Sequence, residues 1–383
     1  MRLTAIPRGI SRIARVRERQ TINVCFVIDG LTRAGTETQL LALIRHLDRQ
    51  KVRPSLCVLR GNGSSNDLYP DDCPVAELGL AKLLRPSALA AATRLASFWR
   101  KLRTDVVVTY LLDSTYFATP LARLCGIRHV VRVRNNVGYW LTPLHSRLGR
   151  IVGKICTVTV TNSEVGRKAL AANEGLPADG IRVIENGVDV ERFPPTAPPN
   201  TGRSVARIGA VANLRGVKNI DGLVRAAAII RRADPRVRFD VAGEGDERPI
   251  LEDQIRVAGL ADCFVLTGAV RDVPGFLAGL DVAVLCSHSE SMSNALLEYM
   301  AAGRAIVATD VGSNSRLVRH EREGLIVPPG NDEALAKAIA RLLGDATLAR
   351  RLGTAARERA ASEFSRGAMV RRFEEFFSSL VKK

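Results

Sequence analysis

Two acidic residues lie close together in the stretch SESMSNALLEYMAAG (Ser289–Gly303), with seven residues between Glu290 and Glu298. In a continuous helix, eight residues at 100° each would leave the two side chains about 80° apart. We therefore predict that Glu290 lies in a loop and Glu298 inside a helix that begins after it. Both carboxylates could then accept hydrogen bonds from the hydroxyls of a sugar or a ribose. The alternative is a pair of solvated surface charges.

Basic residues occur in a second predicted loop, in the stretch VANLRGVKN, which contains Arg215 and Lys218. Cations at this place could stabilise the negative charge of a departing diphosphate. We therefore assign Glu290, Lys218 and Arg215 as the catalytic candidates, although two basic residues in a loop are also common on ordinary surfaces. The chain has no D-x-D triplet and no paired C-x-x-C spacing, so we expect no metal and no other cofactor.

Short β-rich runs alternate with helical stretches along the chain, which predicts an α/β protein with parallel sheets covered on both faces. The proline-rich segment FPPTAPPNTG (Phe193–Gly202) interrupts this order once. We predict two doubly wound, Rossmann-like domains that face each other across a cleft. The expected division is a basic arm (1–20), an N-terminal domain (21–192), a linker (193–204), a C-terminal domain (205–362) and a helix (363–383) that could cross back to the first domain.

Several glycines and helix starts could approach a phosphate. Gly35 lies at the start of a predicted helix, where backbone amides and the helix dipole favour an anion. Gly243 lies in the turn GEGDER, which resembles half a dinucleotide fingerprint, but Arg248 stands where a third glycine is needed, so a redox domain is disfavoured. For Gly35, an ordinary strand-to-helix turn is an equally good explanation. Asn294 could orient a ligand or could be a polar residue of the first helical turn.

From FVLTGAVRDVPGFLAGLDVAVLCSHSESMSNALLEYMAAG to EREGLIVPPGNDEALAKAI, the sequence resembles the retaining glycosyltransferases of family 4 (group 1), which have the GT-B fold. The resemblance covers about Asn23 to the C-terminus, and it implies that the domain at 21–192 binds the acceptor and the domain at 205–362 binds the nucleotide sugar. It implies transfer of a sugar from a nucleoside diphosphate sugar, a UDP- or GDP-sugar, with retention at the anomeric carbon and with no metal. The departing phosphate oxygen would take the acceptor proton.

The resemblance also implies roles for single residues. Glu298 would bind the ribose, Glu290 the donor sugar, and Lys218 with Arg215 the diphosphate. The base would meet the backbone at Val270 and Arg271, and the amides of Ser291, Met292 and Ser293 would hold the sugar. The donor-binding candidates are therefore Gly35, Asn213, Gly243, Val270, Arg271, Ser291, Met292, Ser293, Asn294 and Glu298.

Three positions depart from the family pattern. Asn213 stands where many relatives have arginine, and Arg316 takes the place of an acid. A frequent histidine is replaced by Arg134, Asn135 or Asn136. These departures leave two alternatives to a transferase. One is a non-catalytic protein that binds a nucleotide sugar or a glycan, and the other is a nucleotide-sugar epimerase or a phosphorylase on the same architecture.

The formal net charge is +17, and residues 1–190 carry 28 Lys and Arg against 15 Asp and Glu. A basic first domain favours a lipid-linked or saccharide acceptor that is anionic and an anionic membrane surface as partner, and no nucleic-acid motif is present. Two segments could touch lipid, 88–103 and 138–154, although both could instead be core-packing helices. The seven cysteines are interpreted as buried residues of a reducing compartment. We expect a cytoplasmic protein, peripheral at the inner face of the membrane.

Overall fold

The computed structural model describes residues 21–31, 34–61, 66–80, 82–83, 85–135, 138, 142–194 and 205–382. The predicted basic arm, most of the predicted linker, Tyr139 and Trp140 lie outside the described residues.

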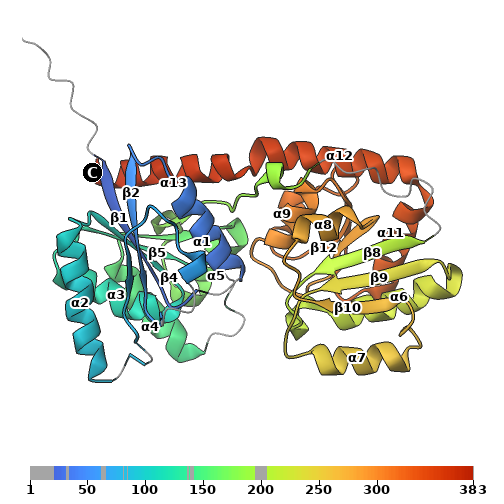
Figure 1. The fold of residues 1–383 in the computed structure, drawn as a ribbon, viewed down its shortest axis with the longest axis horizontal. Coiled ribbons are helices and arrows are strands. Elements are labelled where there is room, and N and C mark those ends of the chain that lie inside the picture. The colour runs from blue at the N-terminus through green and yellow to red at the C-terminus, as the bar shows by residue number, and fades with distance from the viewer. Residues whose placement is uncertain are drawn as a thin grey trace, which may run out of the picture.

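The first lobe is built on a seven-stranded parallel sheet in the order β3-β2-β1-β4-β5-β6-β7 (Figure 1). Its strands are short runs rich in Val and Ile, buried on both faces as in other parallel sheets. They are β1 (Ile22–Ile28), β2 (Val52–Val58), β3 (Val75–Glu77), β4 (Val106–Tyr110), β5 (His129–Val133), β6 (Val158–Thr161) and β7 (Ile181–Val183). The intervening helices are α1 (Gly35–His46), α2 (Ser87–Lys101), α3 (Leu112–Leu124), α4 (Pro143–Ile155) and α5 (Glu164–Glu174). The strand order reverses between β1 and β4.

The second lobe contains a six-stranded parallel sheet in the order β10-β9-β8-β11-β12-β13. Its strands are β8 (Ala206–Val211), β9 (Val237–Ala242), β10 (Phe264–Gly268), β11 (Val282–Leu285), β12 (Ala305–Thr309) and β13 (Leu325–Val327). Its helices are α6 (Ile220–Ala233), α7 (Arg248–Val257), α8 (Val273–Ala278), α9 (Asn294–Ala301), α10 (Asn314–Leu317) and α11 (Asp332–Gly344). Here the order reverses between β8 and β11. The predicted α/β fold with two parallel sheets is confirmed.

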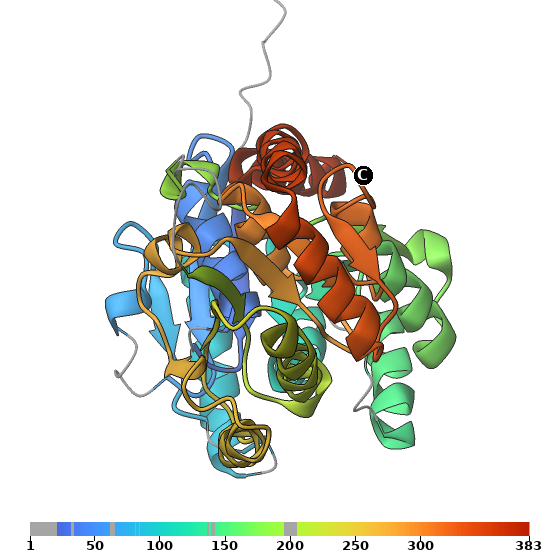
Figure 2. The same ribbon diagram turned by 90° about the vertical axis from the view of Figure 1, so that its right-hand side faces the viewer.

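The last two helices lie along one side of both lobes, as Figures 1 and 2 show. Helix α12 (Ala346–Glu363) packs on α9 of the second lobe, whereas α13 (Arg366–Val381) packs on α1 and β1 of the first. Met369, Phe373 and Phe377 of α13 are buried in the core of the first lobe. The chain therefore passes between the lobes a second time, beside its first crossing, where the Val188 amide donates to the Phe364 carbonyl at 2.9 Å.

Burial tests two of the expectations drawn from the sequence. In α2, Leu95 and Trp99 are buried against the sheet, so the core-packing interpretation of segment 88–103 is confirmed. The interpretation of all cysteines as buried is wrong for Cys125, which is exposed where α3 ends. In the described part of the chain, none of the helices combines the length and the apolar character that crossing a membrane requires.

Candidate active site

Two charged residues meet at the point where the strand order of the second lobe reverses. Lys218 ends the turn Gly216–Lys218 after β8, and Glu290 lies in the loop after β11. The Lys218 Nζ donates to Glu290 Oε1 at 2.7 Å, and the Ser287 hydroxyl donates to the same oxygen at 2.8 Å. Ligands of open α/β sheets bind at such reversal points. The pair is only partly buried, so a ligand can reach it.

The Lys218 turn is fixed to β11 by Asn219. Asn219 has the left-handed backbone (φ 54°) that asparagine tolerates, and its side-chain amide donates to the Cys286 carbonyl at 3.1 Å. The His288 amide adds a bond to the Val217 carbonyl at 2.8 Å. The loops after β8 and β11 therefore hold Lys218 and Glu290 together before any ligand binds.

Glu298 lies within α9, and Glu290 lies in the loop before it, as predicted. The Glu298 side chain is largely enclosed, and this burial raises the pKa of its carboxyl group to about 7, although the positive charge of Arg192 opposes the shift. No hydrogen-bond donor among the described residues reaches the carboxyl group. A carboxylate that is desolvated and unpaired is suited to accept hydrogen bonds from the hydroxyls of a ligand.

Ser291, Met292 and Ser293 place their side chains against protein rather than in open space. The Ser291 hydroxyl donates to Asn162 Oδ1 at 2.7 Å and lies 2.8 Å from the Ser163 hydroxyl, both in the first lobe. The Met292 sulfur accepts from the Asn186 amide at 3.3 Å, and the Ser293 hydroxyl caps α9. Within the described ranges, the amides of residues 291–293 find no acceptor, so a ligand would meet this turn through its backbone.

Asn294 is the first residue of α9, as one of its two expected roles requires, and its side chain also joins the two lobes. The Nδ2 group donates to the Gly35 carbonyl at 3.1 Å. The Oδ1 atom accepts from Gln39 at 3.1 Å and from Asn186 at 2.8 Å. At Gly35 a Cβ atom would lie 2.6 Å from Asn294 Nδ2, so the glycine permits this close contact. Gly35 and Asn294 are thus brought together, as parts of one junction.

The remaining predicted donor contacts lie along the same carboxyl edge of the second sheet. Asn213 and Arg215 are exposed in the loop after β8, beside the Lys218 turn. Val270 is half-buried and Arg271 exposed, between β10 and α8. Gly243 has φ 149°, and a Cβ there would lie 1.8 Å from the Ala212 carbonyl, so its glycine is needed for packing of two loops.

A cavity of about 320 Å³ lies in the first lobe at the carboxyl ends of β1, β4 and β5, and most of the residues that line it were not singled out from the sequence. Asp29 lines it, and its carboxylate accepts from the amides of Ser114 at 2.6 Å and Asp113 at 3.2 Å. Burial raises the pKa of Asp29. Arg134, a departure from the family pattern, lines the same cavity. The signal for Asp29 was its place directly after β1.

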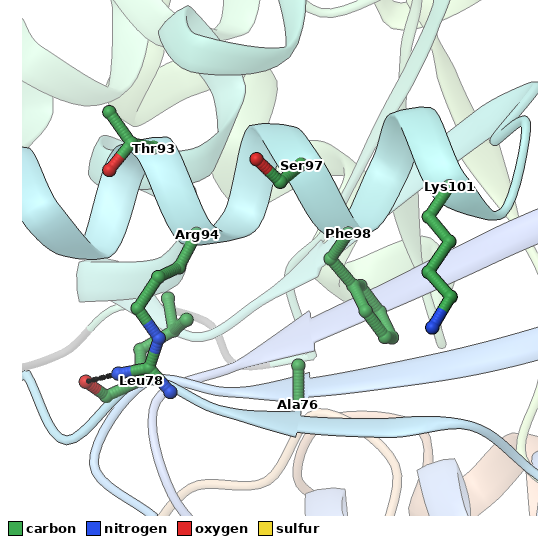
Figure 3. A pocket seen from close by; sticks show the side chains of 7 residues that line it. All are labelled: Ala76, Leu78, Thr93, Arg94, Ser97, Phe98 and Lys101. Carbon is green, nitrogen blue, oxygen red and sulfur yellow. Dashed lines mark hydrogen bonds between the residues drawn. The ribbon is translucent and has the colours of Figure 1, made fainter.

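A second hollow, of about 390 Å³, lies between α2 and the edge strand β3 (Figure 3). Arg94 donates there to the Leu78 carbonyl, while Phe98 and Lys101 point towards the sheet. Because α2 covers the side of the first lobe away from the second (Figure 1), this hollow is not part of the cleft site. Within the described ranges, no three His, Cys, Asp or Glu side chains gather closely enough to hold a metal ion.

The profile described as Glycosyltransferase Family 4 matches residues 33–192, and that described as Glycosyl transferases group 1 matches residues 205–345. The lipopolysaccharide core biosynthesis glycosyltransferase LpsD of Rhizobium meliloti is 25% identical over 92% of this chain and 97% of its own length. An exopolysaccharide phosphotransferase of Streptomyces coelicolor is 33% identical over 58% of this chain, but the match spans only 23% of that protein.

Solved structures resemble the whole fold. Anabaena HepE in complex with UDP has a TM-score of 0.80 at 19% identity, covering 94% of this chain and 100% of that one. A glycosyltransferase from Rickettsia africae has a TM-score of 0.82 at 20% identity, covering 95% of this chain and 100% of its own. The two profiles together span most of the chain, and the chain therefore belongs to the family 4, group 1, glycosyltransferases and has their GT-B fold.

Proposed function

We propose that this protein transfers a sugar from a nucleoside diphosphate sugar, a UDP- or GDP-sugar, to a lipid-linked or saccharide acceptor, with retention at the anomeric carbon. The observation that carries the proposal is the Lys218–Glu290 pair, 2.7 Å apart where the sheet order reverses, with the unpaired Glu298 on the helix that follows. Such a group of residues offers a cation for a diphosphate and carboxylates for hydroxyls.

Each residue of the site has a separate role in the proposed reaction. Lys218 and Arg215 stabilise the departing diphosphate, and Glu290 and the amides of residues 291–293 hold the donor sugar. Glu298 accepts from the ribose diol. The bond from the anomeric carbon to the diphosphate breaks, the acceptor oxygen bonds to the same face of that carbon, and the acceptor proton passes to the departing phosphate oxygen. Neither a metal nor another cofactor takes part.

The relatives and the positive charge of the first lobe support the proposed donor and acceptor classes. HepE was solved with UDP, and LpsD is named for lipopolysaccharide core biosynthesis. The strongly basic first lobe suits an acceptor with anionic groups. We place the reaction in the biosynthesis of cell-envelope glycans.

Helix α4 supports a location at the cytoplasmic face of an anionic membrane. Leu144 and Ile151 are 62% and 57% exposed on one face of this helix, and Arg147 and Lys154 are also exposed. An apolar stripe flanked by basic residues is suited to the interface of an anionic bilayer. Sedimentation with vesicles of phosphatidylglycerol, compared with phosphatidylcholine, tests this, and equal binding to both would contradict it.

A thermal-shift screen with UDP-, GDP-, ADP- and dTDP-sugars tests the function, because a ligand that binds the folded state raises the Tm. The stabilising donor is then incubated with candidate saccharide acceptors, and NMR of the product reports the anomeric configuration. Retention in the product is the expected result. Donor binding without turnover under every acceptor would instead support a non-catalytic protein, and conversion of the donor sugar itself would support an epimerase.

A further inference from the structure

The cavity of the first lobe lies at the reversal point of its own sheet. It is lined by Asp29, Thr36, Leu111, Leu112, Asp113, Val133, Arg134 and Asn135. Leu111 has φ 69°, a backbone conformation that is costly for a residue other than glycine and that concentrates at functional sites. The cavity is therefore a defined structural feature of the carboxyl edge of this sheet.

Behind Arg134, which lines the cavity, two guanidinium groups converge on one buried carboxylate. Arg132 donates to Glu174 Oε2 at 2.7 Å, and Arg134 lies 3.7 Å from Glu174 Oε1. Arg132 and Glu174 are 1% exposed and Arg134 is 4% exposed, so solvent does little to screen them. Two guanidinium groups share one carboxylate, which leaves one buried positive charge without a counterion, an arrangement that costs free energy.

Asp29 and Asp113 also line the cavity, but among the described residues neither lies within ion-pair distance of Arg134. Asp113 forms an ion pair with Arg60. Asp29 is held by backbone amides, and across the described chain Glu174 is the one acid within ion-pair distance of Arg134. Tyr116 also lies nearby, and burial raises the pKa of its phenol, which keeps it neutral. Within the part of the chain that the structure describes, the Nε atom of Arg134 and the Oδ1 atom of Asn135 are buried and have no hydrogen-bond partner.

We propose that Arg134 binds an anionic group, a carboxylate or a phosphate carried by the acceptor sugar, with Asn135 and Asp29 beside it to bind hydroxyls. This inference rests on the proposed function and names the chemistry of its acceptor. A planar guanidinium matches the geometry of both anions. The bound anion gives Arg134 a counterion that it does not share with Arg132, so an anionic sugar binds and an uncharged sugar of the same shape does not.

The test measures the Tm of the full chain with D-glucuronate, glucose 6-phosphate or D-glucose, each at the same ionic strength set with NaCl. We expect an anionic sugar to raise the Tm and glucose to have no effect. Stabilisation by glucuronate alone identifies a carboxylate, and stabilisation by glucose 6-phosphate alone identifies a phosphate. Equal responses to all three sugars would overturn the proposal.

Two variants show whether Arg134 is responsible. Arg134→Gln should weaken binding of the anionic sugar on the order of tenfold or more, while its own Tm stays equal or rises because the excess charge is removed. Arg134→Lys, which keeps the charge but not the planar fork, should bind with intermediate affinity. Arg53→Gln removes an exposed charge from β2 and should bind like wild type.

If Arg134→Gln binds the anionic sugar as tightly as Arg53→Gln does, the proposal is wrong. A parallel titration of the wild-type protein with UDP reports the donor site separately. If UDP binds but anionic sugars are not preferred over glucose, only the inference about Arg134 is wrong. Absence of UDP binding, by contrast, counts against the proposed function.

Discussion

The two lobes place charged residues at corresponding points of their sheets but balance the charges differently. In the second lobe, Lys218 and Glu290 pair one to one at 2.7 Å and remain partly open to solvent. In the first lobe, Arg132 and Arg134 share Glu174 in a fully enclosed cluster. A one-to-one ion pair that solvent reaches can separate for a ligand at a small cost in free energy. A buried cluster of two cations and one anion instead exerts an electrostatic field that solvent does little to screen. The comparison predicts that removing Lys218 from the second lobe costs mainly activity, whereas removing the shared carboxylate of Glu174 from the first lobe costs mainly stability.

The largest expected loss of stability follows Glu174→Gln. The substitution leaves two guanidinium groups buried without an anion, and removing one partner of a buried pair costs about 3–5 kcal/mol. Urea unfolding followed by circular dichroism measures the free energy of unfolding. Glu164→Gln, on the same helix, breaks an exposed pair with Arg167 and should cost less than about 1 kcal/mol. If both variants lose the same free energy of unfolding, the buried cluster does not depend on the charge of Glu174.

Lys218→Ala should produce the reverse pattern, with a large loss of activity and little loss of stability. A donor that stabilises developing charge typically contributes about 10²–10³ in kcat, and hydrolysis or transfer of the donor found in the thermal-shift screen measures it. Lys337→Ala removes an exposed lysine of α11 in the same lobe and should retain wild-type rates. Wild-type kcat in Lys218→Ala would remove this residue from the site.

The sequence predicted the second lobe's site better than the first lobe's, for a physical reason. Glu290 and Lys218 lie in short loops that directly follow strands, so the order of strands alone brings them to one edge. The cluster at Arg132 forms because Glu174, at the end of α5, contacts Arg132 of β5, and no local sequence pattern indicates this contact. The lobe junction at Asn294 likewise depends on how the two domains meet. The order of strands and the loops that follow them could thus be predicted from the sequence, whereas contacts that depend on how helices and lobes pack together could not.

Glu298 provides a pH-dependent test of whether the second lobe keeps an unpaired acid for a ligand. Burial raises its pKa from 4.5 to about 7, so the folded state binds more protons than the unfolded state between these values. Stability therefore falls as the pH rises through this window, by about 3 kcal/mol at most, because each pKa unit corresponds to about 1.4 kcal/mol. Glu298→Gln should remove this fall, and Glu358→Gln, at an exposed position of α12, should not.

Donor binding should depend on pH in the opposite sense. Ribose hydroxyls donate to the ionised carboxylate, so the Kd for UDP should increase as the pH falls below about 7. Calorimetric titrations between pH 5.5 and 8.5 measure this dependence, which Glu298→Gln should abolish. A pH-independent Kd in the wild-type protein would show that Glu298 does not face the nucleotide.

The smallest expected effect concerns the contact that joins the two lobes. In Gly35→Ala, the added Cβ would lie 2.6 Å from Asn294 Nδ2, so the side chain must move and release hydrogen bonds to Gly35, Gln39 or Asn186. Because a single such bond contributes about 1 kcal/mol, the free energy of unfolding should fall by about that amount. Small-angle X-ray scattering should then show a larger radius of gyration as the lobes separate. Gly30→Ala adds a Cβ with no atom within 4 Å and should change neither quantity. If both variants behave alike, the bonds at Asn294 do not hold the lobes together, and the balanced site of the second lobe must be aligned with the cavity of the first by α12 and α13 alone.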